Sequence, residues 1–218
     1  MITIFTIEGN IGSGKSTLIR LLQKKYDDIV CILEPVDQWG KIKDQKGESI
    51  LSKFYKDQKK YSFSFQMMAY ISRLVSIKRE IEKNNNKSLM IVTERSVYTD
   101  KEVFAKMLYD DDKIEDVNYK IYLQWFDEFI KDIPLAGIIY LKTSPEISLK
   151  RIIKRSRKGE IIPLEYLEKC HKYHEEWLKG KKILTLNGNL EFENNSDNIL
   201  YNTYTYMQDV WRGIILSR

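Results

Sequence analysis

The sequence predicts an α/β fold in which a parallel sheet of five strands is covered by helices on both faces. Short, nearly continuous apolar segments alternate with longer segments of helical periodicity, and this order is typical of a parallel sheet. A glycine-rich turn joins the first apolar segment directly to a helix. The strands are expected at 2–8, 29–33, 89–94, 136–141 and 182–186.

The helices are predicted from apolar spacing and from residues that favour helix starts. Ser144, Pro145 and Glu146 offer a capping hydroxyl, a proline suited to the first helical position and an acid in the first turn. The stretch 36–48 is polar and is predicted to be irregular. Helices are expected at about 15–26, 49–57, 62–83, 99–109, 115–131, 144–157, from Pro163 onward, and at 197–216.

Length and composition allow one compact domain over residues 1–218. The apolar share of 43% is enough for a core, and the net charge of +5 is below the basic bias of a nucleic-acid-binding domain. No apolar run reaches the ~18 residues that would cross a bilayer. Cys31 and Cys170 form no disulfide framework, and the N-terminus has no targeting layout. We therefore expect a cytoplasmic protein without a membrane or nucleic-acid partner.

A phosphate-binding loop follows the first strand. Residues 9–16 match G-x-x-x-x-G-K-[ST] between a strand and a helix, the context that this motif requires, so the fold is predicted to be that of a P-loop NTPase. The glycines let backbone amides point inward, and the helix N-terminus favours anionic phosphate. Lys15 is predicted to bridge the β- and γ-phosphates of ATP, and the Ser16 hydroxyl to bind Mg²⁺. The predicted ATP-binding residues here are Gly9, Asn10, Ile11, Gly12, Ser13, Gly14, Lys15, Ser16 and Thr17.

Three of the first four strand ends carry residues suited to chemistry. Gly9 follows the first strand, Glu34 follows the second, and Glu94 with Arg95 ends the third. Parallel sheets bind ligands at the carboxyl ends of their strands, so these groups are expected at one edge. There a carboxylate can take a proton from an acceptor hydroxyl, and a guanidinium can neutralise a transferred phosphoryl group. A solvated acid at Glu34 and a structural Glu94–Arg95 pair are the alternative interpretations.

Four further segments lie in order along the chain, each with a long and distinctive pattern. They are EPVDQW (34–39), SFSFQ (62–66), ERSVYTD (94–100) and IPLEYLEKCHKYHEEWL (162–178). Together with the P-loop they resemble the deoxycytidine and deoxyguanosine kinase family of deoxynucleoside kinases, up to about residue 193. The resemblance implies that the chain uses ATP and Mg²⁺ to phosphorylate the 5′-hydroxyl of 2′-deoxynucleosides in nucleotide salvage. It also implies a homodimer.

The resemblance assigns catalysis to the residues at the strand ends. Glu34 matches the general base that takes the proton from the 5′-hydroxyl. Arg95 and Lys15 match the groups that carry the charge developing on the transferred phosphoryl group. Glu94 matches a residue that, with Ser16, helps to hold Mg²⁺.

The helix from 144 carries a series of arginines. Arg151 and Arg155 share a helical face, and Arg157 follows two positions later. The resemblance makes them an arginine-rich lid that closes over the ATP phosphates and excludes water. A solvated charged face and a nucleic-acid patch are the alternatives. The loop at 189–192 matches the segment that contacts the adenine of ATP, with Glu191 and Phe192 as the expected contacts.

The acceptor pocket is expected around Gln66, whose amide has a donor and an acceptor for the Watson–Crick edge of a base. Phe65 and Phe104 offer flat apolar surfaces on which a base stacks. Tyr55 and Glu160 match the groups that hold the sugar 3′-hydroxyl, although the stretch around this glutamate is shorter than in the animal enzymes. Further pocket positions matched by the resemblance are Ile11, Val36, Trp39 and Leu51.

Arg73 and Asp100 bear on the choice of base. Arg73 lies two helical turns after Gln66, on the same face. An arginine–aspartate pair occupies these positions in cytidine- and guanosine-preferring members, and uncharged residues in thymidine-preferring ones. A carboxylate accepts a hydrogen bond from an exocyclic amino group and repels the carbonyl of thymine. Deoxycytidine is therefore predicted first, purine deoxynucleosides next and thymidine last, with the influence of Ala69 on pocket size open.

Two other functions share these features. A nucleoside monophosphate kinase of the thymidylate kinase type has the same loop, sheet and lid, but it needs further basic groups for the acceptor's phosphate. A non-catalytic nucleotide-binding subunit with this fold should have lost catalytic residues, all of which are present here. The neighbouring Cys170, His171 and His174 are interpreted as helix packing rather than as a metal site.

Overall fold

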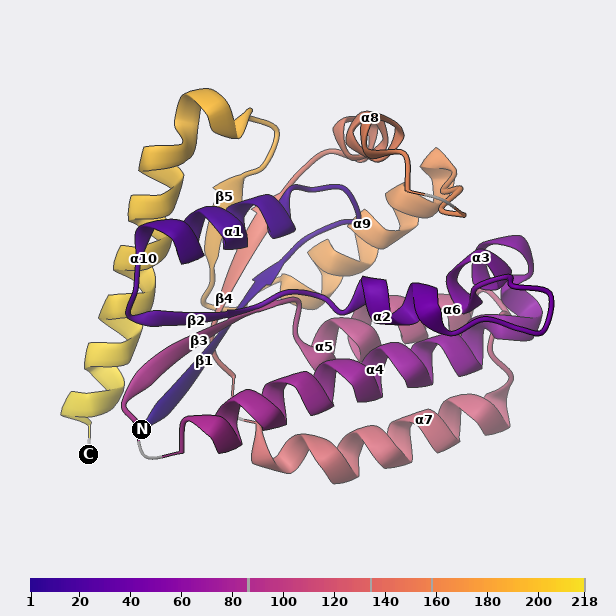
Figure 1. The fold of residues 1–218 in the computed structure, drawn as a ribbon, viewed down its shortest axis with the longest axis horizontal. Coiled ribbons are helices and arrows are strands. Elements are labelled where there is room, and N and C mark those ends of the chain that lie inside the picture. Colours follow the sequence, from indigo (N-terminus) through magenta and orange to yellow (C-terminus); the bar gives the residue numbers. More distant parts are fainter. Residues whose placement is uncertain (86, 134, 158, 218) are drawn as a thin grey trace.

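The computed structural model describes residues 1–85, 87–133, 135–157 and 159–217. It confirms the parallel sheet, whose strands follow the spatial order β2-β3-β1-β4-β5 (Figure 1). Ile7 is in register with Glu94, and Glu8 with Tyr140, so the strand ends meet at one edge. The strands are β1 (Ile2–Glu8), β2 (Ile29–Ile32), β3 (Leu89–Glu94), β4 (Leu135–Lys142) and β5 (Leu184–Asn187).

Helices connect these strands and cover both faces of the sheet. None of the helices within the described ranges is both long and apolar enough to cross a lipid bilayer. The helical elements are α1 (Lys15–Lys25), α2 (Val36–Lys41), α3 (Ile50–Lys56), α4 (Gln58–Lys83), α5 (Val97–Thr99), η1 (Asp100–Ala105), α6 (Lys106–Asp110), α7 (Asp116–Phe129), η2 (Ile130–Asp132), α8 (Pro145–Arg155), α9 (Leu164–Leu178) and α10 (Phe192–Leu216).

The prediction of an irregular stretch over 36–48 is wrong at its start, where α2 forms. Pro35 precedes this helix, and the fixed φ of proline suits a helix start. Asp37 supplies an acid in the first turn, and Trp39 is buried and anchors the helix. A helix this short has too few turns to produce a periodic apolar pattern.

The long helix α4 begins at Gln58 rather than at residue 62. Asp57 caps it, because its carboxylate accepts a hydrogen bond from the Lys60 amide at 3.1 Å. Helix boundaries of this kind depend on a local cap that apolar periodicity does not show. Larger differences are the starts of β5 at Leu184 and of α10 at Phe192, instead of 182 and 197, whereas the bounds of the other strands differ by one residue at most.

The helix predicted at 99–109 consists of α5, the π-helical turn η1 and α6 in direct succession. A π-helical turn contains an extra residue and changes the direction in which the following side chains point. Asp100 and Phe104 lie within η1, and both line the cavity described below. The irregular turn therefore aims two predicted pocket residues at one space.

Successive side chains along each strand point to opposite faces of the sheet and pack into two different apolar cores. Phe5 and Ile7 of β1 pack with α1 and α10, whereas Ile4 packs on the opposite face with Tyr70 of α4 and Tyr122 of α7. Figure 1 shows α1 and α10 on one side of the sheet and α4 and α7 on the other. The burial of both faces explains why the strands are largely apolar.

A third apolar cluster is built by α2, α3, the first half of α4, α6 and α9. Phe65 stacks on Phe54 with ring centroids 4.4 Å apart and meets the edge of Trp39 at 5.6 Å. The Trp39 indole nitrogen donates a hydrogen bond to the Ser72 hydroxyl at 2.8 Å, which fixes the ring on α4. This aromatic cluster forms one wall of the cavity described below.

His174 of α9 is fully buried beside the rings of Phe104 and Tyr140. Its Nδ1 lies 2.7 Å from the Cys170 carbonyl, and its Nε2 has no hydrogen-bond partner in the part of the chain that the structure describes. Burial lowers the pKa of His174 to about 3, since a charged imidazole is unfavourable there. The ring is therefore neutral in the folded protein at ordinary pH.

The folded protein should lose stability as the pH falls below about 6.5, the pKa of histidine in an unfolded chain. Because the pKa of His174 is lower in the folded state, protonation favours the unfolded chain until the pH reaches the folded-state value near 3. This group should remove about 2 kcal/mol from the free energy of unfolding between pH 7 and pH 5. Urea unfolding at both pH values measures the difference.

The matched variants change the chain's two histidines one at a time. His174→Asn keeps a donor for the Cys170 carbonyl but cannot titrate, so its free energy of unfolding should change by about 2 kcal/mol less over this interval. His171→Asn, on the same helix, should retain the contribution of His174. Equal pH dependence in wild type and His174→Asn would contradict the account.

Candidate active site

A cavity of about 950 Å³ opens at the carboxyl edge of the sheet, between the P-loop, α8 and the aromatic cluster. Four predicted site residues lie outside its lining: Gly9, Asn10, Ser13 and Arg73. The predicted residues that line it are Ile11, Gly12, Gly14, Lys15, Ser16, Thr17, Glu34, Val36, Trp39, Leu51, Tyr55, Phe65, Gln66, Glu94, Arg95, Asp100, Phe104, Arg151, Arg155, Arg157, Glu160, Glu191 and Phe192.

Asn10 organises the P-loop from within. Its side-chain oxygen accepts a hydrogen bond from the Ile11 amide, and its side-chain nitrogen donates to the Leu167 carbonyl of α9, both at 2.8 Å. Its own carbonyl accepts from the Ser13 amide at 3.2 Å. Asn10 and Ser13 therefore support the loop, and the bond from Asn10 to Leu167 anchors the loop to α9.

Two glycines of the loop permit close contact with neighbouring elements. A Cβ at Gly12, where φ is +77°, would lie 2.5 Å from the Ser148 carbonyl oxygen of α8. A Cβ at Gly14, where φ is +103°, would lie 2.8 Å from the Phe192 ring. Both positions exclude a larger side chain, so α8 and the start of α10 pack directly on the loop.

Lys15 is buried at the first position of α1. Its ammonium group donates to the Asn10 carbonyl at 2.6 Å and to the Ser13 hydroxyl at 3.4 Å. Burial lowers the pKa of Lys15 to about 7, and the positive charge of Arg95 adds to the shift. An anionic phosphate in the cavity would raise this pKa again and be held by the charged ammonium group.

Ser16 and Glu94 come together from α1 and β3. The Ser16 hydroxyl donates to Glu94 Oε1 at 2.6 Å, while Oε2 accepts from the Glu34 amide at 3.3 Å. A hydroxyl and a carboxylate are hard oxygen donors of the kind that Mg²⁺ prefers, beside a loop suited to phosphates. This pair therefore fits the predicted metal ligands in chemistry and in position.

Glu34 lies between two arginines. Arg95 Nη1 donates to Glu34 Oε1 at 3.0 Å and to Oε2 at 2.9 Å, and Arg73 Nη2 donates to Oε1 at 2.8 Å. Burial raises the pKa of Glu34, but Arg95 and Arg73 outweigh it and lower that pKa to about 2. The carboxylate is therefore ionised at neutral pH. Glu34 is therefore a partly buried, paired carboxylate and not the solvated acid that was the alternative interpretation.

Arg95 has an unusual backbone conformation. Its φ is +61°, in the left-handed region that costs a non-glycine residue about 1 kcal/mol. The guanidinium lies 5.1 Å from the centre of the Phe104 ring, and Nη2 is 3.4 Å from the Gly9 carbonyl. Its Nε, also buried, lacks a hydrogen-bond partner among the described residues. Strained residues with unused donors are frequent at ligand sites.

Arg73 joins three parts of the site from beneath the cavity. Its Nε donates to Asp100 Oδ2 at 2.8 Å, Nη1 to the Glu94 carbonyl at 2.6 Å and Nη2 to Glu34 at 2.8 Å. Although burial acts to lower it, Asp100 and Glu34 raise the pKa of Arg73 above its ordinary value. The predicted Arg73–Asp100 pair therefore forms, and it also contacts Glu34.

Gln66 of α4 is buried and lines the cavity. Its side-chain oxygen has no hydrogen-bond partner among the described residues. Phe65, Phe104 and Trp39 supply apolar surface around it. An amide with an unpaired oxygen among aromatic rings is suited to a planar ligand that has its own polar edge.

The predicted lid arginines divide into two groups. Arg151 donates through Nη1 to the carbonyls of Ser13 at 3.0 Å and Gly188 at 2.7 Å, so it ties α8 to the P-loop. Arg155 lies 2.5 Å and Arg157 3.5 Å from the Glu160 carboxylate. The prediction that the helix extends through Arg157 is wrong, because α8 ends at Arg155 and the next residue has a φ of +51°.

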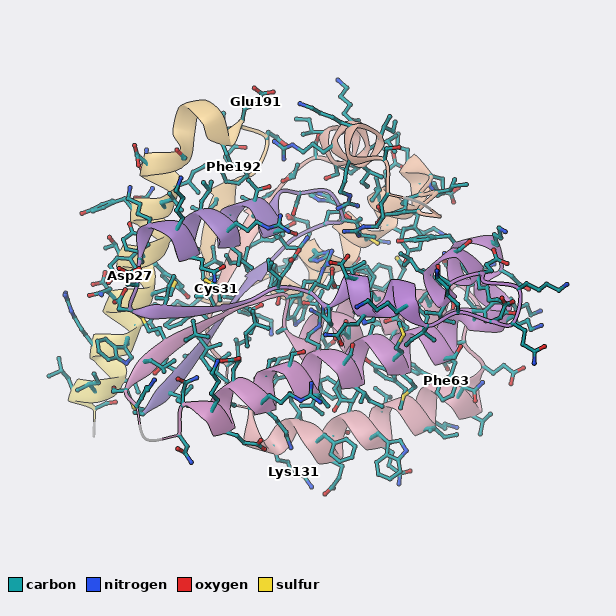
Figure 2. The ribbon with its side chains drawn as sticks, viewed as in Figure 1. Asp27, Cys31, Phe63, Lys131, Glu191 and Phe192 are labelled. Carbon is teal, nitrogen blue, oxygen red and sulfur yellow. The ribbon has the colours of Figure 1, made fainter. Side chains whose placement is uncertain are left out.

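The two residues predicted to contact adenine differ in their surroundings. Figure 2 shows Glu191 at the outer end of the turn before α10, with its side chain directed away from the body of the protein. Phe192 is partly buried in the core between α1 and the sheet and contacts Gly14. Phe192 therefore supports the P-loop as well as lining the cavity.

The deoxynucleoside kinase sequence pattern matches residues 5–207, which is nearly the whole chain. A probable deoxycytidine kinase of fowlpox virus is 36% identical over 220 residues, covering 94% of this chain and 88% of the viral protein. The chain belongs to the deoxynucleoside kinase family. It therefore transfers a phosphoryl group to a deoxynucleoside.

Other relatives match this chain with similar identity and over a similar share of its length. Human deoxycytidine kinase is 35% identical over 83% of this chain and 76% of its own length. The mitochondrial deoxyguanosine kinase of Xenopus laevis is 33% identical over 88% of this chain and 83% of its own length. The resemblance inferred from the sequence motifs is thus confirmed at the level of the family.

Several cavity residues of this deoxynucleoside kinase were not predicted. Lys150 and Lys154 lie on α8 next to Arg151 and Arg155, and helical spacing could have suggested them. Arg20 follows Ser16 by one turn of α1, which is a similar signal. Ala69 was considered only for its effect on pocket size, and Asn189 belongs to the loop at 189–192 expected to contact adenine. The other lining residues, not singled out in the sequence, are Leu33, Asp37, Phe54, Ile147 and Tyr166.

Proposed function

We propose that the chain transfers the γ-phosphoryl group of ATP, with Mg²⁺, to the 5′-hydroxyl of 2′-deoxynucleosides, with deoxycytidine preferred and purine deoxynucleosides next. The observation that carries the proposal is the Glu34 carboxylate, held by Arg95 and Arg73 in one cavity that the P-loop and Gln66 also line. An acceptor hydroxyl there lies between a base and a phosphate-binding loop. We also propose one domain over 1–218 that acts in the cytoplasm.

Glu34 is proposed as the group that orients and deprotonates the acceptor hydroxyl. Among the described residues, Oε1 accepts two hydrogen bonds and Oε2 accepts one, so Oε2 can accept another from a hydroxyl. A carboxylate with a pKa near 2 is a weak base but is always ionised at neutral pH. Phosphoryl transfer through a loose transition state depends chiefly on positioning and charge, so a strong base is not required.

The cations around the P-loop are proposed to bind the phosphates. Lys15 and Arg95 lie on the side of the cavity nearest the loop, and Arg155 with Arg157 extends from the end of α8. Mg²⁺ held by Ser16 and Glu94 would neutralise charge on the phosphate oxygens. Arg155 and Arg157 pair with Glu160 here, so they would have to exchange this carboxylate for phosphate when the lid closes.

The base is proposed to lie among Phe65, Phe104 and Trp39, with its polar edge toward Gln66 and Asp100. The fixed Asp100 carboxylate accepts from an exocyclic amino group and disfavours a carbonyl at that position. Glu160 and Tyr55 line the cavity at a place suited to the sugar. The names of the relatives, deoxycytidine and deoxyguanosine kinase, agree with bases that carry an amino group.

A nucleoside monophosphate kinase fits less well. The additional cavity cations Arg20, Lys150 and Lys154 lie on α1 and α8, on the donor side. At the acceptor end, Arg73 is already engaged with carboxylates. Among the described residues, the acceptor end is thus suited to an uncharged nucleoside. The intact set of catalytic candidates likewise disfavours a non-catalytic subunit.

A homodimer through α4 and α7 is proposed from an exposed apolar surface. These helices pack together through the Tyr70 hydroxyl, which lies 3.4 Å from the carbonyls of Trp125 and Phe126. Large apolar side chains repeat at intervals of four on their outer faces, so each helix has a continuous stripe. The exposed residues of this surface are Ile71, Val75, Val117, Ile121, Trp125 and Phe129.

The activity is tested by incubating the protein with Mg²⁺-ATP and each of four deoxynucleosides and measuring monophosphate formation. Turnover led by deoxycytidine is expected. Glu34→Gln should lower kcat by about 10²- to 10⁴-fold with a smaller change in the nucleoside KM, because the proton acceptor is lost. The control Glu176→Gln, exposed on α9, should keep wild-type kinetics. Full activity in Glu34→Gln, or product only from monophosphates, would contradict the proposal.

The base preference is tested by the double variant Arg73→Gln/Asp100→Asn. It replaces the ion pair with amides, which can donate to the thymine carbonyl. The ratio of kcat/KM for deoxycytidine to that for thymidine should fall by at least about tenfold. The ratio of the two kcat/KM values cancels any loss of activity that affects both substrates equally, such as the loss caused by breaking the Arg73–Glu34 contact. A ratio equal to that of the wild type would rule out this source of specificity.

Oligomeric state is tested by sedimentation equilibrium. Trp125→Glu places a charge in the exposed apolar surface of α7 and should convert a dimer to a monomer. Tyr201→Glu, exposed on α10 at the opposite face of the sheet, should remain dimeric. A monomeric wild type, or a dimeric Trp125→Glu variant, would refute this interface.

A further inference from the structure

Glu8 is a buried carboxylate without an assigned role. It is the last residue of β1, directly before Gly9, and its side chain is fully buried beneath the cavity. Its Oε1 accepts hydrogen bonds from the Thr6 hydroxyl and the Ser96 amide, both at 2.8 Å. Its Oε2 accepts from the Thr99 hydroxyl. A carboxylate is retained in such a place only when its hydrogen bonds are satisfied, as they are here.

Two of these three partners lie within four residues after Arg95. Ser96 is the next residue, and Thr99 ends α5. On the other side, the Arg95 amide donates to the Ile7 carbonyl at 3.0 Å. The end of β1 thus holds both the Arg95 amide and the amide that follows it. A non-glycine residue with a φ of +61° keeps this conformation only where its surroundings fix it.

The direction of the Arg95 side chain depends on this backbone conformation. Its guanidinium reaches Glu34 at 2.9 and 3.0 Å and lies over Phe104. If the turn relaxed to a negative φ, the side chain would leave its Cα in a different direction and these contacts would be lost. The negative charge of Glu8 also favours the charged forms of the neighbouring Arg95 and Lys15.

We propose that Glu8 is a positioning residue that anchors the Ser96 amide and the Thr99 hydroxyl and so holds Arg95 against Glu34. Glu8 does not line the cavity, so any effect on phosphoryl transfer is indirect, and its bonds to Ser96 and Thr99 direct that effect to Arg95. The inference rests on the role proposed above for Arg95. It differs from a purely structural role, in which Glu8 would affect folding but not the turnover of the folded protein.

Two conservative variants separate geometry from charge. Glu8→Gln keeps an oxygen at the length needed to accept from the Ser96 amide but removes the charge. Glu8→Asp keeps the charge but withdraws the carboxylate by one methylene. Positioning predicts that Glu8→Asp lowers kcat by about 10²-fold, because small displacements of a catalytic group are costly, while Glu8→Gln stays within about tenfold of wild type. The reverse order would overturn the proposal.

A double-variant cycle tests the route through Arg95. Glu8→Asp should add at most about a twofold loss of kcat in an Arg95→Ala background, since a group already absent cannot be displaced. An equal fold loss in both backgrounds would overturn the proposal. The control Thr93→Val removes a buried hydroxyl that donates to the Phe5 carbonyl on the adjacent strand, and it should keep wild-type kcat.

All kcat values are referred to the folded fraction, measured by thermal unfolding of the same samples. Wild-type turnover in the same assay separates the proposed kinase function from the proposed role of Glu8. An inactive wild type refutes the proposed function and with it this inference. An active wild type with an equally active Glu8→Asp variant refutes only the role of Glu8.

Discussion

The Glu34 carboxylate held between two buried guanidinium groups is the interaction on which the rest of the site depends. Burying charges is unfavourable unless each is paired, and removing one partner leaves another uncompensated. Around this carboxylate, Glu8, Glu94 and Asp100 accompany Lys15, Arg73 and Arg95, so four carboxylates face three cations. Ion pairs link Glu34, Asp100, Arg73 and Arg95 to one another, and the excess negative charge is compatible with a metal cation beside Ser16 and Glu94.

The fold assembles this cluster by bringing strand ends to one edge. The parallel registers of β2, β3 and β1 bring Glu34, Glu94 and Glu8 to one edge of the sheet, where the Glu94 carboxylate accepts a hydrogen bond from the Glu34 amide. The helix α4 supplies Arg73 from one face of the sheet, and the π-helical turn η1 directs Asp100 toward it. Arg73 touches both Asp100 and Glu34, so the group proposed to contact the base and the group proposed to accept the hydroxyl proton share one support.

The strands, the P-loop and part of the site could be predicted from the sequence, and each for a physical reason. The strands and the P-loop could be predicted because continuous apolar runs and a fixed glycine spacing are local signals. The Arg73–Asp100 pair followed from family resemblance, whereas the bond from Arg73 to Glu34 joins segments distant in sequence and had no local signal. The short helix α2 depends on burial of Trp39, and the end of α8 depends on the left-handed Ser156, neither of which periodicity records. Glu8 gave no signal because the role proposed for it depends on the positive φ of Arg95, which the sequence does not reveal.

The most direct test of the account is a crystal structure with deoxycytidine, Mg²⁺ and a non-hydrolysable ATP analogue. The account predicts the 5′-oxygen within hydrogen-bond distance of Glu34 Oε2, with Arg95 and Arg73 still on the carboxylate and the cytosine amino group facing Asp100. A 5′-oxygen remote from Glu34, or a nucleoside bound with its base toward the P-loop, would contradict it.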